Sequence, residues 1–272
     1  MKAFVSKSII ACSIAAASVF AGAAANAATF NPFTVDPTGP SVNAPFTADK
    51  ITGNYTEVAT FNTDGTFNVS LYWSAGQFVT NGGNTALQSN QTGLGFDYGL
   101  YAVYTASGTV GTAANGATTF TFLPGSGSLS MYLDDNVNTV ANGNPTNGST
   151  AFSLNNTSDD ILLATGNPMS GLGTLDPSLS TCGSNGINCG SFGSSTTFDL
   201  TGAGSAFFVA PNPFYAMSFQ SGQLNNFTPT GTQIINGSLD VVFSNEVPEP
   251  ASLGLLGLGL LGLGFARSRK QK

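Results

Sequence analysis

Hydrophobic and polar residues alternate along much of this chain, and the alternation is clearest between Thr66 and Ser74. There Phe67, Val69, Leu71 and Trp73 fall on one face of an extended backbone, and the polar residues between them fall on the other. A period of two residues is typical of a β-strand that buries one face. The pattern therefore predicts a half-buried strand over these nine residues.

The segment Tyr55–Phe61 is expected to pair with this strand as a β-hairpin. The connection Asn62–Gly65 ends in Asp-Gly, which readily supplies the positive φ angle of a tight turn. Further strands are predicted from shorter alternating runs that are separated by Gly, Ser and Asn. These runs are 99–105, 118–123, 128–134, 151–154, 161–164, 196–201, 206–209, 214–221 and 233–243.

No window of helical length between Ala28 and Glu246 shows apolar residues at positions i, i+3 and i+4. Many short strands at this spacing indicate a sandwich or a barrel. We expect an all-β domain over residues 28–246, a sandwich or jelly-roll-like arrangement of many short antiparallel strands.

The N-terminal residues predict export. Lys2 and Lys7 precede the apolar stretch Ile9–Ala25, and Ala25-Asn26-Ala27 is the small-x-small pattern at which signal peptidases cut. Residues 1–27 are therefore expected to be a signal peptide that is removed from the mature protein.

The C-terminal segment 247–272 has three parts in a fixed order. Pro248, Glu249 and Pro250 begin it in an extended conformation, because proline cannot continue a helix. An apolar run of about 16 residues follows, which predicts a short transmembrane helix, and Arg267, Arg269 and Lys270 close it with positive charge that should remain cytoplasmic.

This tail resembles the PEP-CTERM sorting signal of Gram-negative bacteria. The resemblance implies that an exosortase is a partner, that cleavage occurs near Pro248-Glu249-Pro250, and that the protein is held transiently in the inner membrane. The cell surface or the extracellular matrix would be its destination. The alternative is an ordinary C-terminal anchor or a dimerising helix, because its glycines would allow close helix packing.

Charge and cysteine content limit the partners further. The predicted mature domain has one lysine, Lys50, against thirteen acidic residues, a net charge of −12 that disfavours nucleic acid as a partner. Cys182 and Cys189 enclose a glycine-containing loop, and in an oxidising compartment we expect them to form a disulfide.

Catalytic chemistry has little support in the sequence. The chain has no histidine, which is the commonest general base, and it has no Gly-x-Ser-x-Gly nucleophile motif. Two carboxylate pairs, Asp134-Asp135 and Asp159-Asp160, leave a carbohydrate-active enzyme as the alternative, but adjacent residues of a strand point to opposite faces. We therefore expect a protein that is not an enzyme.

One polar cluster is a candidate cation site. Asp134, Asn136 and Asn138 recur at every second residue in a turn-rich stretch, so that their side-chain oxygens could converge on Ca²⁺. The stretch lacks the terminal glutamate of a full calcium loop, and an ordinary Asx-rich turn is the simpler interpretation. No cofactor is expected apart from this calcium ion.

Five runs of the exported part resemble the flocculation-associated PEP-CTERM protein family. They are Phe46–Val58, Gly99–Thr109, Cys189–Gly193, Pro213–Phe227 and Ile235–Phe243. The resemblance implies a non-enzymatic role in floc or biofilm formation together with an exopolysaccharide.

Aromatic faces stack on sugars, and amide side chains bond to sugar hydroxyl groups. The segment Pro211–Phe227 concentrates both kinds of side chain, although alternating phenylalanines in a β protein are more often core residues. The candidate polysaccharide contacts are Phe214, Tyr215, Phe219, Gln223 and Phe227.

Overall fold

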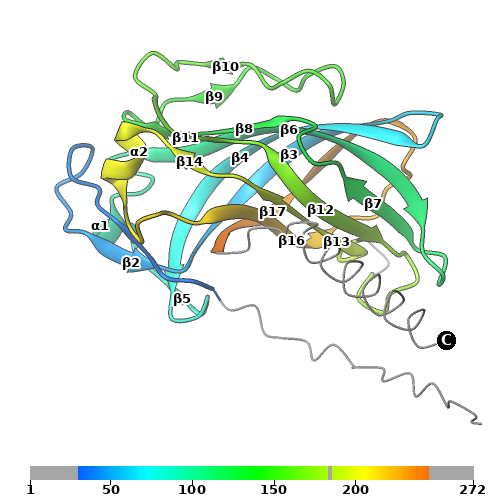
Figure 1. The fold of residues 1–272 in the computed structure, drawn as a ribbon, viewed down its shortest axis with the longest axis horizontal. Coiled ribbons are helices and arrows are strands. Elements are labelled where there is room, and N and C mark those ends of the chain that lie inside the picture. The colour runs from blue at the N-terminus through cyan, green and yellow to red at the C-terminus, as the bar shows by residue number, and fades with distance from the viewer. Residues whose placement is uncertain (1–29, 183–185, 245–272) are drawn as a thin grey trace, which may run out of the picture.

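The computed structural model describes residues 30–182 and 186–244, and these residues are mostly β-strand (Figure 1). The strands are β1 Phe33–Val35, β2 Phe46–Ala48, β3 Lys50–Phe61, β4 Thr66–Thr80, β5 Thr85–Ala86, β6 Gly99–Thr112, β7 Thr118–Phe122, β8 Ser128–Asp134, β9 Val140–Ala141, β10 Leu154–Asn155, β11 Ile161–Gly166, β12 Pro168–Leu175, β13 Gly190–Thr196, β14 Asp199–Leu200, β15 Phe208–Ala210, β16 Ala216–Leu224 and β17 Gly231–Ser244. Two short helices, α1 Ser89–Thr92 and α2 Gly202–Phe207, interrupt them.

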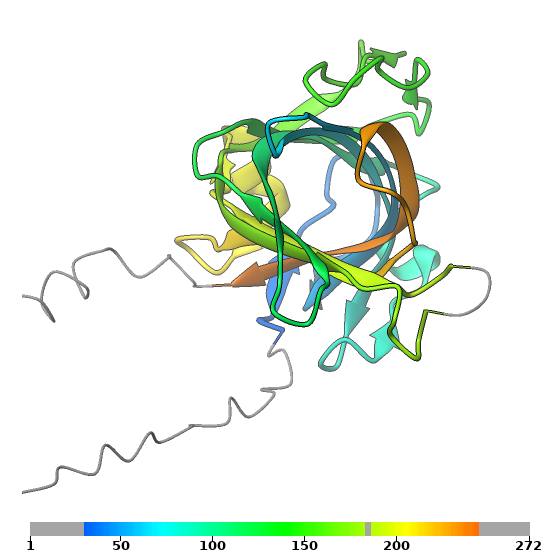
Figure 2. The same cartoon turned by 90° about the vertical axis from the view of Figure 1, so that its right-hand side faces the viewer.

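Eight strands close into a barrel-like antiparallel sheet, which Figure 2 shows end-on. The order around the ring is β3, β4, β6, β7, β12, β13, β16 and β17, and β17 pairs with β3 to complete it. The longest strands, β3, β4, β6 and β17, lie side by side and form a continuous wall. Ring closure satisfies the backbone groups that an open sheet would leave unpaired at its edges.

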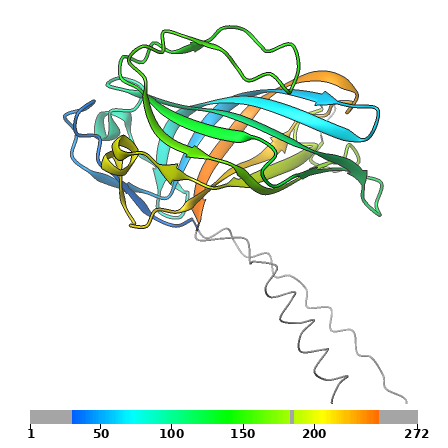
Figure 3. The same cartoon turned by 45° about the horizontal axis from the view of Figure 1, so that its top comes forward.

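The ring divides along β6. The second half of β6 pairs with β7, whereas its first half pairs with β8, and β8 continues outward to β11 and β14. The segment that carries β9 and β10 runs over the outside of the barrel beyond these strands (Figure 3).

The interior is filled by one face of each strand. Phe67, Val69, Leu71 and Trp73 of β4 are all buried, which confirms the predicted face of that strand. The indole nitrogen of Trp73 donates a hydrogen bond of 3.0 Å to the carbonyl oxygen of Leu239 on β17. This contact satisfies the buried polar atom and links two strands across the interior.

An aromatic cluster closes the end of the barrel at which β4 and β17 finish. The small sheet β15-β1-β2 contributes Phe33, which packs edge-on against Phe243 with ring centroids 4.8 Å apart. Phe208 and Phe214 pack against the same Phe243 ring at 5.7 and 5.1 Å. This end is therefore filled with side chains, while a small pocket lies at the other end.

The predicted hairpin is confirmed. Phe61 pairs with Phe67 and Tyr55 with Trp73 across the turn, where Gly65 has a φ of 82°. The Asp64 carboxylate accepts the backbone N–H of Thr66 at 2.9 Å and fixes the turn.

The all-β prediction is confirmed, but the arrangement differs from the expected sandwich or jelly roll. Strands of 12 to 15 residues, such as β3 and β4, curve around one interior, so the sheet closes on itself and does not form two layers. The strand predicted at 206–209 is wrong in its first half, since α2 extends to Phe207. The Thr201 hydroxyl accepts the N–H of Gly204 at 3.0 Å and caps this helix.

Candidate functional site

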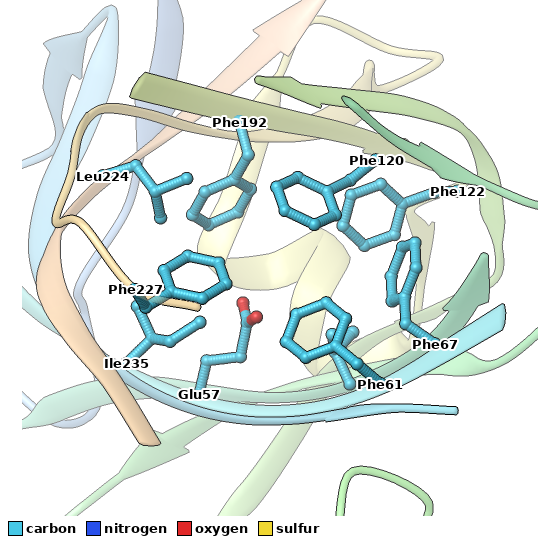
Figure 4. A pocket seen from close by; sticks show the side chains of 10 residues that line it. Glu57, Phe61, Phe67, Phe120, Phe122, Phe192, Leu224, Phe227 and Ile235 are labelled. Carbon is cyan, nitrogen blue, oxygen red and sulfur yellow. The ribbon is translucent and has the colours of Figure 1, made fainter. Parts of the chain in front are cut away.

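A pocket lined by aromatic rings lies inside the barrel at the end opposite the Phe33 cluster (Figure 4). We call it the phenylalanine pocket, and its volume is about 30 Å³. It is lined by Glu57, Phe61, Phe67, Val69, Phe120, Phe122, Phe192, Leu224, Phe227 and Ile235.

The ring faces of the pocket are fixed mainly by strands. Phe61 ends β3 and Phe120 lies on β7, with ring centroids 5.7 Å apart. Phe227 comes from the connection between β16 and β17, and it stacks on both rings at 5.7 and 5.9 Å. One wall of the pocket is therefore carried by a loop.

Glu57 is the only polar residue of this lining. Strand alternation places it on the inward face of β3 together with Tyr55, Ala59 and Phe61. Its residue is only 7% exposed, and its carboxyl group points toward the rings in Figure 4. A single acid therefore faces an otherwise apolar space.

No described residue compensates the Glu57 carboxyl group by a hydrogen bond or an ion pair. Lys50, the one basic residue in the part of the chain that the structure describes, pairs with Asp240 at 2.8 Å. Burial raises the pKa of Glu57 to about 7, because the charged form loses its water of solvation. Burial likewise raises the pKa of Tyr55 and Tyr104, and the nearby Glu57 charge adds to both shifts.

The sequence reasoning did not single out Glu57. The signal was present, because the run from Tyr55 to Phe61 places one acid on the same face as two aromatic residues. An acid on the apolar face of a strand is rarely buried without a partner, and that makes it a functional candidate.

A second polar cluster forms on the outside, where Asp134, Asp159 and Asp160 bring carboxylate oxygens within 4.8 Å of one another. Asp134 ends β8 and is buried, and its oxygens accept the backbone N–H groups of Asn136 at 3.3 Å and Thr139 at 2.8 Å. These bonds form the Asx-rich turn that was the simpler interpretation of this stretch.

The predicted calcium ligands are only partly brought together. Asn136 donates its side-chain amide to Asp159 at 2.7 Å, and Asn138 is exposed. Asp159 and Asp160 join Asp134 in place of the two asparagines, and the Tyr101 hydroxyl donates to Asp160. Three carboxylates are a donor set suited to a hard cation.

The carboxylate pairs considered for catalysis separate as strand geometry requires. Asp134 is buried and its neighbour Asp135 is exposed. The approach between Asp134 and the Asp159-Asp160 pair is tertiary, and residue spacing did not predict it.

The five candidate polysaccharide contacts do not share one exposed face. Phe219 is fully buried inside the barrel, so it cannot contact a polymer, and Phe214, Tyr215 and Phe227 are partly buried against the core. Gln223 is exposed. Alternation in β16 explains the difference, because Met217, Phe219 and Ser221 point inward together.

The predicted disulfide is present. Cys182 and Cys189 are bonded with their Cα atoms 4.3 Å apart, in the connection between β12 and β13. Cys189 is fully buried, and its N–H donates to the carbonyl oxygen of Leu224 at 2.8 Å. The bond therefore ties this loop to the end of β16.

The predicted signal peptide and sorting tail, including Pro248, Glu249, Pro250, Arg267, Arg269 and Lys270, lie outside the described residues. Within the described ranges, neither helix has the length and apolar character needed to cross a membrane.

One comparison with known proteins gives a match. The family model for the PEP-CTERM protein-sorting motif matches residues 246–270, which includes the predicted motif and most of its basic end. No curated protein and no solved structure matches the chain. The chain therefore carries a PEP-CTERM sorting motif, which marks it as an exported protein that is processed by an exosortase.

Proposed function

We propose that the exported domain is a non-enzymatic matrix protein that promotes floc or biofilm formation together with an exopolysaccharide. The observation that carries this proposal is the sorting motif at residues 246–270, which directs the domain to the cell exterior. The resemblance of five runs to the flocculation-associated family supports it. No buried site is needed, because adhesion to a polymer uses exposed side chains in many weak contacts.

The contacts with the polymer belong to side chains that solvent reaches. Phe96, in the loop after α1, is 79% exposed, and its ring is free to stack on a sugar. Gln223 is also exposed and accepts a hydrogen bond from the Ser238 hydroxyl at 3.3 Å. We expect Phe96→Ala to weaken polymer binding without lowering stability. Leu172→Ala, at an aliphatic residue that is 68% exposed, is the matched control.

A divalent cation would assist binding to an acidic polymer. The mature domain has a net charge of −12, so it repels an anionic polysaccharide unless a cation bridges them. Asp134, Asp159 and Asp160 are the proposed Ca²⁺ ligands on the protein side. Chelation should then weaken binding to an acidic polymer and leave binding to a neutral polymer unchanged.

The same aspartates carry the alternative, a secreted carbohydrate-active enzyme. Two carboxyl groups about 5 to 9.5 Å apart can hydrolyse a glycosidic bond, and the structure brings Asp134 close to Asp159 and Asp160. Release of reducing ends from the polymer, abolished by Asp159→Asn, would establish the enzyme and overturn the matrix role.

The deciding experiment deletes the gene and measures cell settling. We expect deleted cells to make polysaccharide but to stay dispersed, and the full gene to restore settling. A gene truncated before Pro248 should restore it less, because its product lacks the sorting motif. Normal settling of the deleted cells would contradict the proposal.

A further inference from the structure

Glu57 is a buried acid whose partner is missing from the described chain. It is 7% exposed, and no described side chain or backbone group donates a hydrogen bond to it. A buried carboxylate is costly unless a cation or donor compensates it. Because the group faces a cavity and not packed side chains, a partner from solution can occupy the position in front of it (Figure 4).

The lining of the pocket selects the charge of that partner. Seven of its ten lining residues are Glu57 and six phenylalanines, and the faces of aromatic rings carry negative potential. A carboxylate and several ring faces together attract a cation and repel an anion. A sugar is disfavoured, because the remaining lining residues, Val69, Leu224 and Ile235, offer no side-chain hydrogen bonds to its hydroxyl groups.

We propose that the phenylalanine pocket binds a small organic ammonium ion, with its charged head on Glu57 and its apolar body among Phe61, Phe120 and Phe227. This site is separate from the polymer-binding surface and does not depend on the matrix role.

The size of the pocket fits the head of such a ligand. A volume of about 30 Å³ is close to the volume that one water molecule occupies in the liquid, about 30 Å³, so it accommodates an ammonium group. The body needs further room, and Phe227 provides it when its side chain rotates. Its position in a loop and its partial burial allow this movement, whereas Phe61 and Phe120 lie on strands.

The ionisation of Glu57 alone controls the pairing. The other titratable groups that face it are Tyr55 on β3 and Tyr104 on β6, and burial raises the pKa of both so that they stay neutral. Tyr104 shares a hydrogen bond of 2.6 Å with the Ser194 hydroxyl. Since the pKa of Glu57 is about 7, ammonium binding should strengthen as the pH rises from 5 to 8.

The test uses three probes of one shape and different charge: benzylammonium, benzyl alcohol and benzoate. Calorimetry on the processed protein recovered from the producing cells would measure each at pH 5 and pH 8. We expect benzylammonium to bind at least about tenfold more tightly than benzyl alcohol at pH 8, and less selectively at pH 5. Benzoate should bind most weakly.

Two variants separate the carboxylate from general charge. Glu57→Gln should remove the preference for benzylammonium over benzyl alcohol. Asp135→Asn removes a charge from an exposed turn and should preserve the preference. Equal binding of the three probes, no binding of benzylammonium, or a preference that survives in Glu57→Gln would each overturn the proposal.

Discussion

At the scale of single residues, the interior of this barrel contains one group that opposes folding at neutral pH. Glu57 occupies a position where strand alternation requires an inward side chain, and its neighbours on that face are apolar or aromatic. Its protonated form is compatible with this environment, whereas its charged form has lost solvation without gaining a partner.

Replacement of Glu57 by glutamine should stabilise the protein in a pH-dependent way. The folded state holds the Glu57 proton up to a pKa of about 7, and the unfolded chain releases it near the usual value of 4.5. The carboxyl group therefore costs nothing below pH 4.5, and its cost rises with pH until it levels off above pH 7. The final difference is roughly 3 kcal/mol, from about 1.4 kcal/mol per pKa unit.

Denaturant unfolding of both proteins between pH 4 and pH 8.5 would measure this difference. The two free energies of unfolding should coincide at low pH and diverge in favour of Glu57→Gln as the pH rises. A constant difference across the range would show that Glu57 does not titrate with a raised pKa.

At the scale of elements, the β3–β4 ribbon forms the longest continuous pairing and holds the indole of Trp73 in place. The register shifts by one residue between Thr52 and Gly53, which indicates a β-bulge where the chain bends around the barrel. Gly53 lies against Trp73 and the Ser74 backbone, so the strand can pass this point only without a side chain.

Gly53→Ala should therefore destabilise the fold strongly. An added Cβ would overlap the carbonyl oxygen of Ser74 and the Trp73 indole, and both are fixed by backbone pairing or by the bond to Leu239. We expect a loss of at least about 2 kcal/mol in the free energy of unfolding.

The matched control is Gly222→Ala on β16, where an added Cβ meets nothing within 4 Å. Thermal and denaturant unfolding should leave this variant close to the unaltered protein. If both variants lost the same stability, general strand propensity and not the close approach at Gly53 would explain the effect.

At the scale of the whole molecule, a closed β domain is coupled to a tail that determines its destination. The domain contains both its polar clusters and its pocket within residues 30–244, whereas the sorting motif occupies residues 246–270. Sorting can therefore be altered without touching the interior of the barrel.

Glu249→Gln should block processing and leave export intact. The apolar run and the basic end of the tail are unchanged in this variant, so the protein should still reach the membrane, but it loses the acid between Pro248 and Pro250. An immunoblot of cell fractions should show an uncleaved, membrane-associated form. Normal maturation of the variant would contradict recognition of the motif by an exosortase.

The sequence by itself determined the local features of this protein. The alternation in Thr66–Ser74, the Asp64-Gly65 turn and the Cys182–Cys189 pair each depend on residues close in the chain, and the structure confirms all three. The sorting motif is also a linear signal, and it was recognised for that reason.

Tertiary structure decided the closure of the barrel and the location of its sites. Alternation shows which residues share a face, but it does not show whether that face meets a second sheet or curves onto itself. It predicted Phe219 and Phe227 equally well as core or as exposed contacts, and only the path of β16 and the following loop separates them. The approach of Asp134 to Asp159 and the isolation of Glu57 likewise depend on pairings between distant strands.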